Sequence, residues 1–277
     1  MSGQSNFNWT SSALSDVGAV RELNEDAFLE RPDLGLWLVA DGMGGHFAGD
    51  VASQMVVSAM DSLEASGSLS RFVESVEQRL METNARLREY AEREETHTIG
   101  STVVALLIRG EHAVCLWAGD SRMYRYRDGR LEQISQDHAL VEELVERGVL
   151  TREQAVDHPH GNLVTRAVGA ADKLFLDVEI IAIQPGDLFI LCSDGLEKEI
   201  AEQEAAHFAG LASPGEVCRR LLDRALAHGA RDNVTVVSVL IDGRSDGATR
   251  YAGADGGDVA ATEDDADTAR NEQQPPA

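Results

Sequence analysis

Four short apolar runs in this chain each begin or end at an aspartate. They are residues 36–40 before Asp41, 113–119 before Asp120, 188–193 before Asp194, and 234–241 after Asp232. Antiparallel neighbours place the end of one strand beside the start of the next, so these carboxylates can share one rim of a β-structure. Because the runs are spread over most of the chain, such a rim requires both halves to pack together in one domain.

Apolar periodicity divides the chain into strand blocks and helical segments. Strand-like runs cover residues 13–20, 27–30, 36–40, 101–108, 111–118, 123–127, 130–134, 176–183, 188–192 and 234–241. Helical spacing covers residues 51–63, 71–93 and 214–228, the last after an N-cap serine. Asp128-Gly129 predicts a hairpin, and Pro185-Gly186 predicts a turn. Residues 138–170 are polar and mixed, which indicates an excursion of short helices and loops.

Alternating strand blocks and helices predict an α+β fold. We expect an α-β-β-α sandwich, in which two antiparallel sheets stack face to face and helix pairs cover their outer faces. The domain is expected over residues 13–242, after a flexible N-terminus at 1–12. Residues 243–277 are rich in Ala, Gly, Asp and Thr without a periodic apolar pattern, which predicts a disordered acidic tail.

Charge and cysteine content limit the partners and the compartment. The formal net charge is −24, which disfavours nucleic acid and anionic membranes as partners. Cys115, Cys192 and Cys218 are an odd number in apolar settings, so they are expected to be buried reduced thiols. No signal peptide and no apolar run of about 20 residues is present. We expect a soluble, cytoplasmic protein, with a monomer favoured.

Glycines accompany three of the four aspartates. Asp41 is followed by Gly-Met-Gly-Gly-His, in which the glycines let the backbone turn sharply and approach a bound ion closely. Asp194 precedes a glycine, and Asp120 follows one. The Asp194 and Asp120 segments alone are each equally consistent with an ordinary turn, whereas the glycine density after Asp41 favours a functional loop. Together with Asp232 they favour a site for two metal ions, and hard oxygen ligands suit magnesium or manganese rather than zinc.

An early polar segment adds a cation and two further carboxylates. Arg21 offers a planar donor fork suited to a phosphoryl group. Glu25 and Asp26 lie at the opening of the next strand. The alternative for this segment is a surface Arg-Glu pair without a functional role.

These segments resemble, as a set and in order, the metal-dependent protein phosphatases of the PPM, or protein phosphatase 2C (PP2C), type in their bacterial Ser/Thr form. The resemblance runs from about Ser15 to Ile241. Its motifs are Asp16-x-Gly18 with Arg21 and Asn24-Glu25-Asp26, Asp41 to His46, Gly100-Ser101-Thr102, Gly119-Asp120-Ser121-Arg122, Asp137-His138, Ser193-Asp194-Gly195 and Asp232-Asn233. It implies hydrolysis of phosphoserine and phosphothreonine by direct attack of a metal-activated water.

The resemblance also implies the cofactors and their ligands. Two Mn²⁺ or Mg²⁺ ions are expected, with Asp41 bridging them and the Gly42 carbonyl helping to hold one. Asp194 and Asp232 would complete the other metal. The implied partners are phosphorylated proteins, including a cognate Ser/Thr kinase and its substrates.

Further roles are carried over from the family pattern in the same way. Glu25 and Asp26 would act directly on the metals or through metal-bound waters. Asp120 matches a residue that helps to hold a third metal in bacterial members, and Arg21 would bind the substrate phosphate. Residues 146–165 match a variable flap beside the site, which we connect to substrate choice.

The group that protonates the leaving oxygen is left open by the sequence. Some eukaryotic members place a histidine directly after the Asp-Gly pair, where this chain has Met43. His46, another group or a metal-bound water remain candidates, and His46 is equally well explained as a histidine at a helix N-terminus. His138 is ambiguous, and His158 and His160 are expected on the surface of the flap.

Three other classes of protein share part of this pattern. An inactive phosphopeptide-binding module would have no need for all the metal carboxylates. A structural calcium protein would be supported by a twelve-residue Asp-x-Asp-x-Asp-Gly loop, which is missing. A metal-dependent nuclease would share the carboxylates, but the acidic surface disfavours it.

Overall fold

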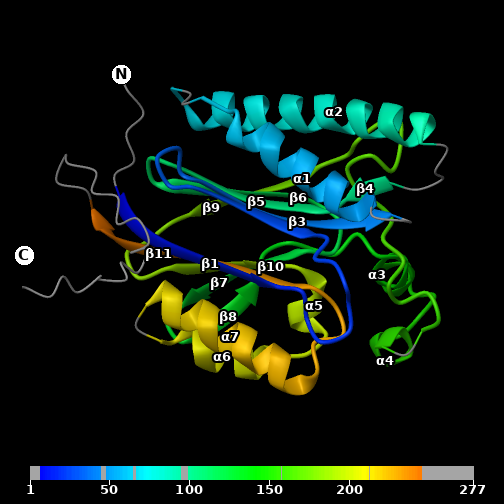
Figure 1. The fold of residues 1–277 in the computed structure, drawn as a ribbon. Coiled ribbons are helices and arrows are strands. Elements are labelled where there is room, and N and C mark those ends of the chain that lie inside the picture. The colour runs from blue at the N-terminus through cyan, green and yellow to red at the C-terminus, as the bar shows by residue number, and fades with distance from the viewer. Residues whose placement is uncertain are drawn as a thin grey trace, which may run out of the picture.

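Two antiparallel sheets stack face to face in the computed structural model, and helices cover the outer face of each sheet (Figure 1). The structure describes residues 7–44, 48–64, 67–94, 99–156, 158–211 and 213–244. The predicted α-β-β-α sandwich is confirmed. None of the helices in these ranges is both long and apolar enough to cross a membrane.

The first sheet has five strands in the order β1-β11-β10-β7-β8. They are β1 (Phe7–Asp16), β7 (Arg122–Arg127), β8 (Arg130–Gln133), β10 (Leu188–Cys192) and β11 (Val234–Arg244). Strands β1 and β11 pair along the whole of β1, with Asp16 opposite Val234 at one end. The first and last described strands therefore lie side by side.

The second sheet has six strands, with the path β2-β3-β5-β6-β9 and β4 paired to β3. They are β2 (Asp26–Arg31), β3 (Leu36–Gly44), β4 (Ile99–Ser101), β5 (Val103–Arg109), β6 (His112–Ala118) and β9 (Asp177–Ala182). The register of β2 and β3 places Asp26 directly opposite Asp41.

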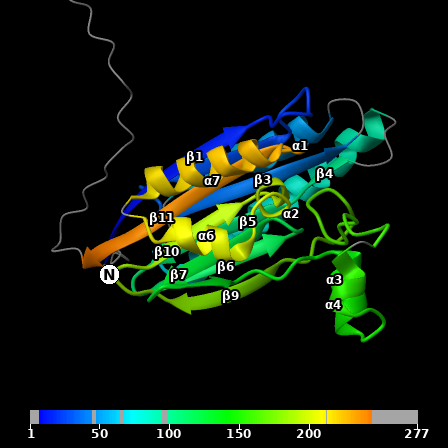
Figure 2. The same cartoon turned by 90° about the horizontal axis from the view of Figure 1, so that it is seen from below.

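Helices lie in three groups (Figures 1 and 2). Helices α1 (Ala48–Asp61) and α2 (Leu69–Arg93) cover the six-stranded sheet, while α6 (Glu202–Ala209) and α7 (Pro214–His228) cover the five-stranded sheet. The excursion predicted for residues 138–170 contains α3 (Leu140–Glu146) and α4 (Arg152–Val156). A four-residue helix, α5 (Asp194–Glu197), directly follows β10 and was not anticipated, and neither was α6.

Three apolar layers hold the sandwich together. One lies between α1, α2 and the six-stranded sheet, one between the two sheets, and one beneath α6 and α7. The middle layer includes the fully buried Trp37 and Phe189. Cys115, Cys192 and Cys218 are buried free cysteines, as predicted.

The N-terminal boundary differs from the prediction. Residues 7–12, expected to be flexible, form the first part of β1. Phe7 and Trp9 are buried between the sheets, and the Trp9 ring meets the edge of Trp37 at a centroid distance of 5.6 Å. No strand signal is visible in the sequence here, because the neighbouring residues Asn8 and Thr10 to Ser12 are polar. Conversely, β1 ends at Asp16, and Gly18 turns the chain with φ +78° where the strand was expected to continue.

Local turn and cap signals act as predicted. Asp128 and Gly129 both have positive φ, 51° and 79°, which is the conformation of a two-residue hairpin between β7 and β8. The Ser213 hydroxyl accepts a hydrogen bond from Glu216 N at the start of α7, and Gly229 ends that helix in the left-handed conformation. The turn at residues 185–186 lies between β9 and β10, which belong to different sheets.

Candidate metal and phosphate site

The predicted aspartates converge at one end of the two sheets. Asp26 and Asp41 face each other across β2 and β3, and Asp120 lies between β6 and β7. Asp194 is separated from the end of β10 by Ser193 alone and is the first residue of α5. Asp232 lies two residues before the start of β11. The charges of the other four all act on the Asp41 carboxyl, so both sheets contribute to one cluster.

Burial and mutual repulsion raise the pKa values of Asp26, Asp41 and Asp120. Burial is the largest cause for Asp41, whose pKa lies well above its ordinary value, followed by the charges of Asp26 and Asp194. Burial also raises the pKa of Asp26 and of Asp120 to about 7 each. Carboxylates in this state resist carrying their full charge unless a cation accompanies them. The cluster therefore favours binding of positive charge.

Asn233 holds the polar segment before β2 in place. Its amide Nδ2 donates to Val17 O at 2.9 Å and to Leu23 O at 3.0 Å. Its Oδ1 accepts a hydrogen bond from Glu25 N at 2.8 Å. These three hydrogen bonds join a residue near the C-terminal end of the domain to the segment 17–25 near its start. Asn233, which is next to Asp232, therefore helps to fix the positions of Arg21 and Glu25.

Hydroxyl groups connect the aspartates to neighbouring strands. Thr102 Oγ1 accepts a hydrogen bond from Asp41 N at 2.9 Å and lies 2.7 Å from Ser121 Oγ. Ser193 Oγ donates to Asp26 Oδ2 at 2.7 Å and accepts from Thr235 N at 3.0 Å. These buried bonds fix the strand ends against each other.

Gly42 allows the chain to pass close to helix α1. A Cβ placed on Gly42 would lie 1.8 Å from Gly49 O, and the Gly42 amide donates to Glu25 O at 3.0 Å. No side chain fits in this position. The glycine after Asp41 is therefore required by the packing as well as by the predicted ligand role of its carbonyl.

Arg21 lies at the open side of the cluster. Its guanidinium is 2.9 Å from Asp232 Oδ1 and 4.0 Å from Glu25 Oε2, and 48% of its side chain is exposed. A half-exposed guanidinium can reach an incoming anion without leaving the site. The alternative of a surface Arg-Glu pair accounts for the longer contact but not for the closer one with Asp232.

Lys198 is a cation of the site that the sequence analysis did not identify. It follows α5, and its Nζ donates to Asp194 Oδ2 and lies 3.6 Å from Asp232 Oδ2. The spacing of four residues from Asp194 was the available signal, since residues so spaced share one helix face.

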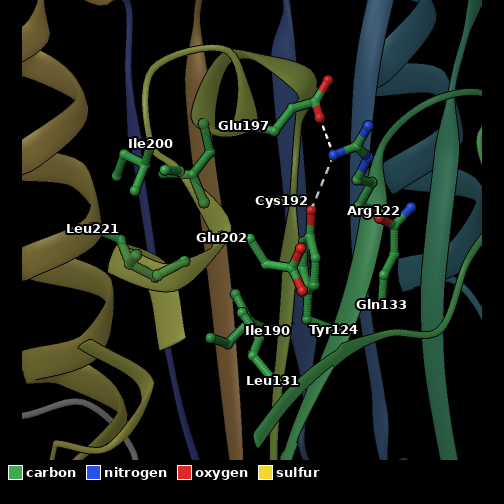
Figure 3. A pocket seen from close by; sticks show the side chains of 13 residues that line it. Arg122, Tyr124, Leu131, Gln133, Ile190, Cys192, Glu197, Ile200, Glu202 and Leu221 are labelled. Carbon is green, nitrogen blue, oxygen red and sulfur yellow. Dashed lines mark hydrogen bonds and ion pairs between the residues drawn. The ribbon is translucent and has the colours of Figure 1, made fainter. Parts of the chain in front are cut away.

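Arg122 and Glu197 form an ion pair, which Figure 3 shows. The charges of Asp194 and Asp120 act on Glu197, so this second charged group lies beside the cluster. Arg122 makes a two-pronged bond to Asp137 at 2.9 and 2.7 Å, an ion pair with Glu197, and a hydrogen bond to the Tyr124 hydroxyl at 3.1 Å. Burial raises the pKa of Glu197 to about 7 despite the facing guanidinium. This network connects the strand after Asp120 with helix α5.

The donor chemistry of the cluster fits a hard divalent cation. Within the described residues, no three or more His, Cys, Asp and Glu side chains form a ready metal cage. Two of the carboxylates pair instead with Lys198 and Arg21. However, Asp194 Oδ1 is buried without a hydrogen-bond partner, and an oxygen in that state is suited to a metal ligand.

The histidines take different positions. His46 lies outside the described residues. His138 is buried, where its Nδ1 accepts from Gly119 N at 3.1 Å and its Nε2 lies 3.1 Å from Asp177. His138 thus supports the backbone next to Asp120. His160 is exposed and His158 half-buried, with the two rings 5.7 Å apart.

A cavity separates the cluster from the predicted flap. Its volume is about 590 Å³, and its walls come from the aspartate loops, from α3 and α4, and from the segment after α4. Its lining includes Asp120, Asp194 and Lys198 from the cluster and Arg152 and Asn162 from the predicted flap. The flap therefore borders the site directly.

The chain is similar to known proteins in both sequence and fold. The chain matches the protein phosphatase 2C family over residues 19–228. It is 34% identical over 234 residues to the serine/threonine phosphatase stp of Listeria welshimeri, covering 81% of this chain and 93% of that protein.

Two solved structures show the same fold. PppA, a key regulatory component of T6SS in Pseudomonas aeruginosa, is 43% identical with a TM-score of 0.80. That match covers 84% of this chain and 98% of PppA. The catalytic domain of the phosphatase PstP in complex with two manganese ions is 33% identical with a TM-score of 0.76, covering 84% and 98%. The chain belongs to the protein phosphatase 2C family.

Proposed function

We propose that this protein is a metal-dependent phosphatase that hydrolyses phosphoserine and phosphothreonine in other proteins. The observation that carries the proposal is the convergence of five aspartates from both sheets in a chain of this family. The related proteins named serine/threonine phosphatases support the substrate class, and the manganese complex of PstP supports the cofactor.

Asp41, Asp194 and Asp232 are the proposed metal ligands, together with the Gly42 carbonyl. Two Mn²⁺ or Mg²⁺ ions bound there would supply a water that ionises near neutral pH and positive charge for the phosphoryl oxygens. Asp120 is proposed to contribute to a third metal. The raised pKa values of Asp26, Asp41 and Asp120 support this assignment, because bound cations would stabilise the ionised form of these carboxyls.

The remaining residues bind the substrate and hold the ligands in position. Arg21 would donate to the phosphate from the open side, where its side chain is half-exposed. Glu25 would act on the metals directly or through water, and Asn233 fixes its backbone. The cavity beside the flap gives room for the residues around the phosphorylated side chain.

Phosphoserine and phosphothreonine side chains are products of protein kinases. We therefore infer that this phosphatase opposes a cognate Ser/Thr kinase and acts on that kinase and its substrates. A cytoplasmic location and a monomeric state accompany this proposal.

Release of phosphate from a phosphothreonine peptide tests the function. We expect turnover with manganese, loss of turnover with a chelator, and a loss of about a thousandfold or more in kcat for Asp41→Asn, since this change would alter a carboxylate proposed to hold the metals. The matched control is Asp223→Asn on the exposed face of α7, which should retain wild-type activity.

Asp41→Asn with near-normal manganese-dependent turnover would contradict the ligand role. A wild-type protein that binds the peptide without releasing phosphate would instead be a binding module. Cleavage of nucleic acid without phosphate release from the peptide would indicate a nuclease.

A further inference from the structure

Lys198 occupies the carboxylate pair that the proposed function assigns to a metal ion. Its ammonium contacts Asp194 Oδ2 and lies 3.6 Å from Asp232 Oδ2. The Asp194 and Lys198 side chains are 11% and 32% exposed, so this pair is shielded from water on the Asp194 side. The contact is therefore stronger than that of an ordinary surface ion pair.

Lysine is rare in this chain. Of the 24 Lys and Arg residues only Lys173 and Lys198 are lysines, and Lys173 is exposed. An ammonium is a compact point charge on a flexible stem, whereas a guanidinium is a planar fork. Lys198 is thus the side chain best suited to enter a site for a small cation and to leave it again.

The ammonium satisfies the cluster only in part. It contributes one positive charge to a cluster of five aspartates that come from both sheets. Asp194 Oδ1 still has no hydrogen-bond partner. A divalent cation would use that oxygen and add a second charge.

Lys198 and a metal ion therefore need the same carboxylate oxygens. We propose that Lys198 is a built-in competitor for the metal: it neutralises part of the cluster in the metal-free protein and must swing away when Asp194 and Asp232 bind an ion. Its presence lowers the affinity for metal and stabilises the metal-free fold. This inference rests on the ligand roles in the proposed function.

The structure has room for the displaced side chain. Lys198 lines the cavity of about 590 Å³ that lies between the cluster and the flap. Asp137 and Glu142 line the same cavity, so the ammonium would meet other carboxylates there. The short helix before Lys198 stays anchored through the ion pair of Glu197 with Arg122. Only the lysine side chain has to move.

Calorimetric titration of the metal-free protein with MnCl₂ measures the competition. We expect Lys198→Gln to bind manganese with a Kd about tenfold lower than the wild type, corresponding to about 1.4 kcal/mol. The same variant should melt at a lower temperature without metal, because its carboxylates have lost a cation. Lys173→Gln is the matched control and should equal the wild type in both measurements.

Magnetic resonance provides a test that needs no stable variant. In wild-type protein labelled with ¹³C in lysine, only two ε-methylene signals are expected. Addition of the diamagnetic Mg²⁺ should shift the Lys198 signal to a position typical of a solvated lysine and leave the Lys173 signal unchanged. A Lys198 signal that does not respond to saturating Mg²⁺ would overturn the proposal.

Asp194→Asn separates this inference from the proposed function. If Asp194→Asn and Asp232→Asn bind manganese as tightly as the wild type, the ligand assignment fails. If these variants lose manganese binding while Lys198→Gln keeps the wild-type Kd or binds more weakly, the ligand assignment stands and competition by Lys198 is refuted.

Discussion

At the scale of single residues, the site is a balance between acidic groups and the few cations near them. Arg21 and Lys198 both contact carboxylates that we assign to metal binding, but they differ in exposure and shape. The half-exposed fork of Arg21 is suited to a phosphate, and the compact ammonium of Lys198 to a metal position. We therefore propose different roles for the two cations, although both lie close to Asp232.

Arg21→Ala should mainly raise the KM for a phosphothreonine peptide. Loss of a charge-assisted contact with the phosphate is expected to weaken binding by about 1.5–3 kcal/mol, with a smaller change in kcat. Steady-state kinetics at saturating manganese measure both constants. Arg219→Ala on the exposed face of α7 is the control, and an unchanged KM for Arg21→Ala would refute the phosphate role.

At the scale of elements, strand β1 connects the start of the domain to its end. Its ten residues pair with β11, and alternate side chains point into the layer between the sheets. Trp9 is 8% exposed, and its indole Nε1 donates to Pro32 O at 3.2 Å. The first residues of the domain are therefore part of its core.

Trp9→Ala should lower the free energy of unfolding by about 3–5 kcal/mol, the usual range for removing a large buried aromatic side chain. Thr10→Ala, on the opposite face of the same strand, should cost less than about 1 kcal/mol. Chemical denaturation measures both values. Equal and small effects would mean that residues 7–12 contribute little to the fold, as the sequence analysis expected.

At the scale of the whole molecule, the fold gathers acidic groups that repel one another. The formal net charge of −24 is distributed over the entire chain, but the structure buries several carboxyls at one end of the sandwich. Burial raises the pKa values of Asp26 and Asp120 among them to about 7, above those of the unfolded chain. Folding without metal therefore takes up protons.

This linkage predicts a pH-dependent stability of the metal-free protein. The relevant pH window runs from the pKa of these carboxyls in the unfolded chain, about 4, to their pKa in the folded protein. Within this window the carboxyls are protonated in the folded protein but ionised in the unfolded chain. Stability should be highest at the lower end of this window and fall as the pH rises to about 7. The slope is about 1.4 kcal/mol per pH unit for each carboxyl.

Melting temperatures in chelator from pH 5 to 8 test this expectation. Saturating manganese should reduce the slope, because the ions stabilise the charged carboxylates. Asp120→Asn should also reduce it in the metal-free protein, since one of the two carboxyls is removed. A stability that rises with pH in chelator would contradict the raised pKa values.

Local signals in the sequence determined much of the fold. The hairpin at Asp128-Gly129 and the caps of α7 depend on backbone conformations set within a few residues, and both agree with the structure. The apolar run before Asp194 likewise marked the end of β10, whereas β3 continues past Asp41 to Gly44 because β4 pairs with this extension. The motifs around them indicated the family, which the comparisons confirm.

Longer-range features could be read only from the tertiary structure. The start of β1 at Phe7 depends on a partner strand more than 200 residues away, and β9 and β10 enter different sheets although a short turn joins them. The sequence by itself determined the acidic residues and the glycine turns next to them. Tertiary packing decided which charged groups lie close together. It placed Lys198 next to Asp194 and Asp232, because a buried carboxylate is stabilised by a nearby cation.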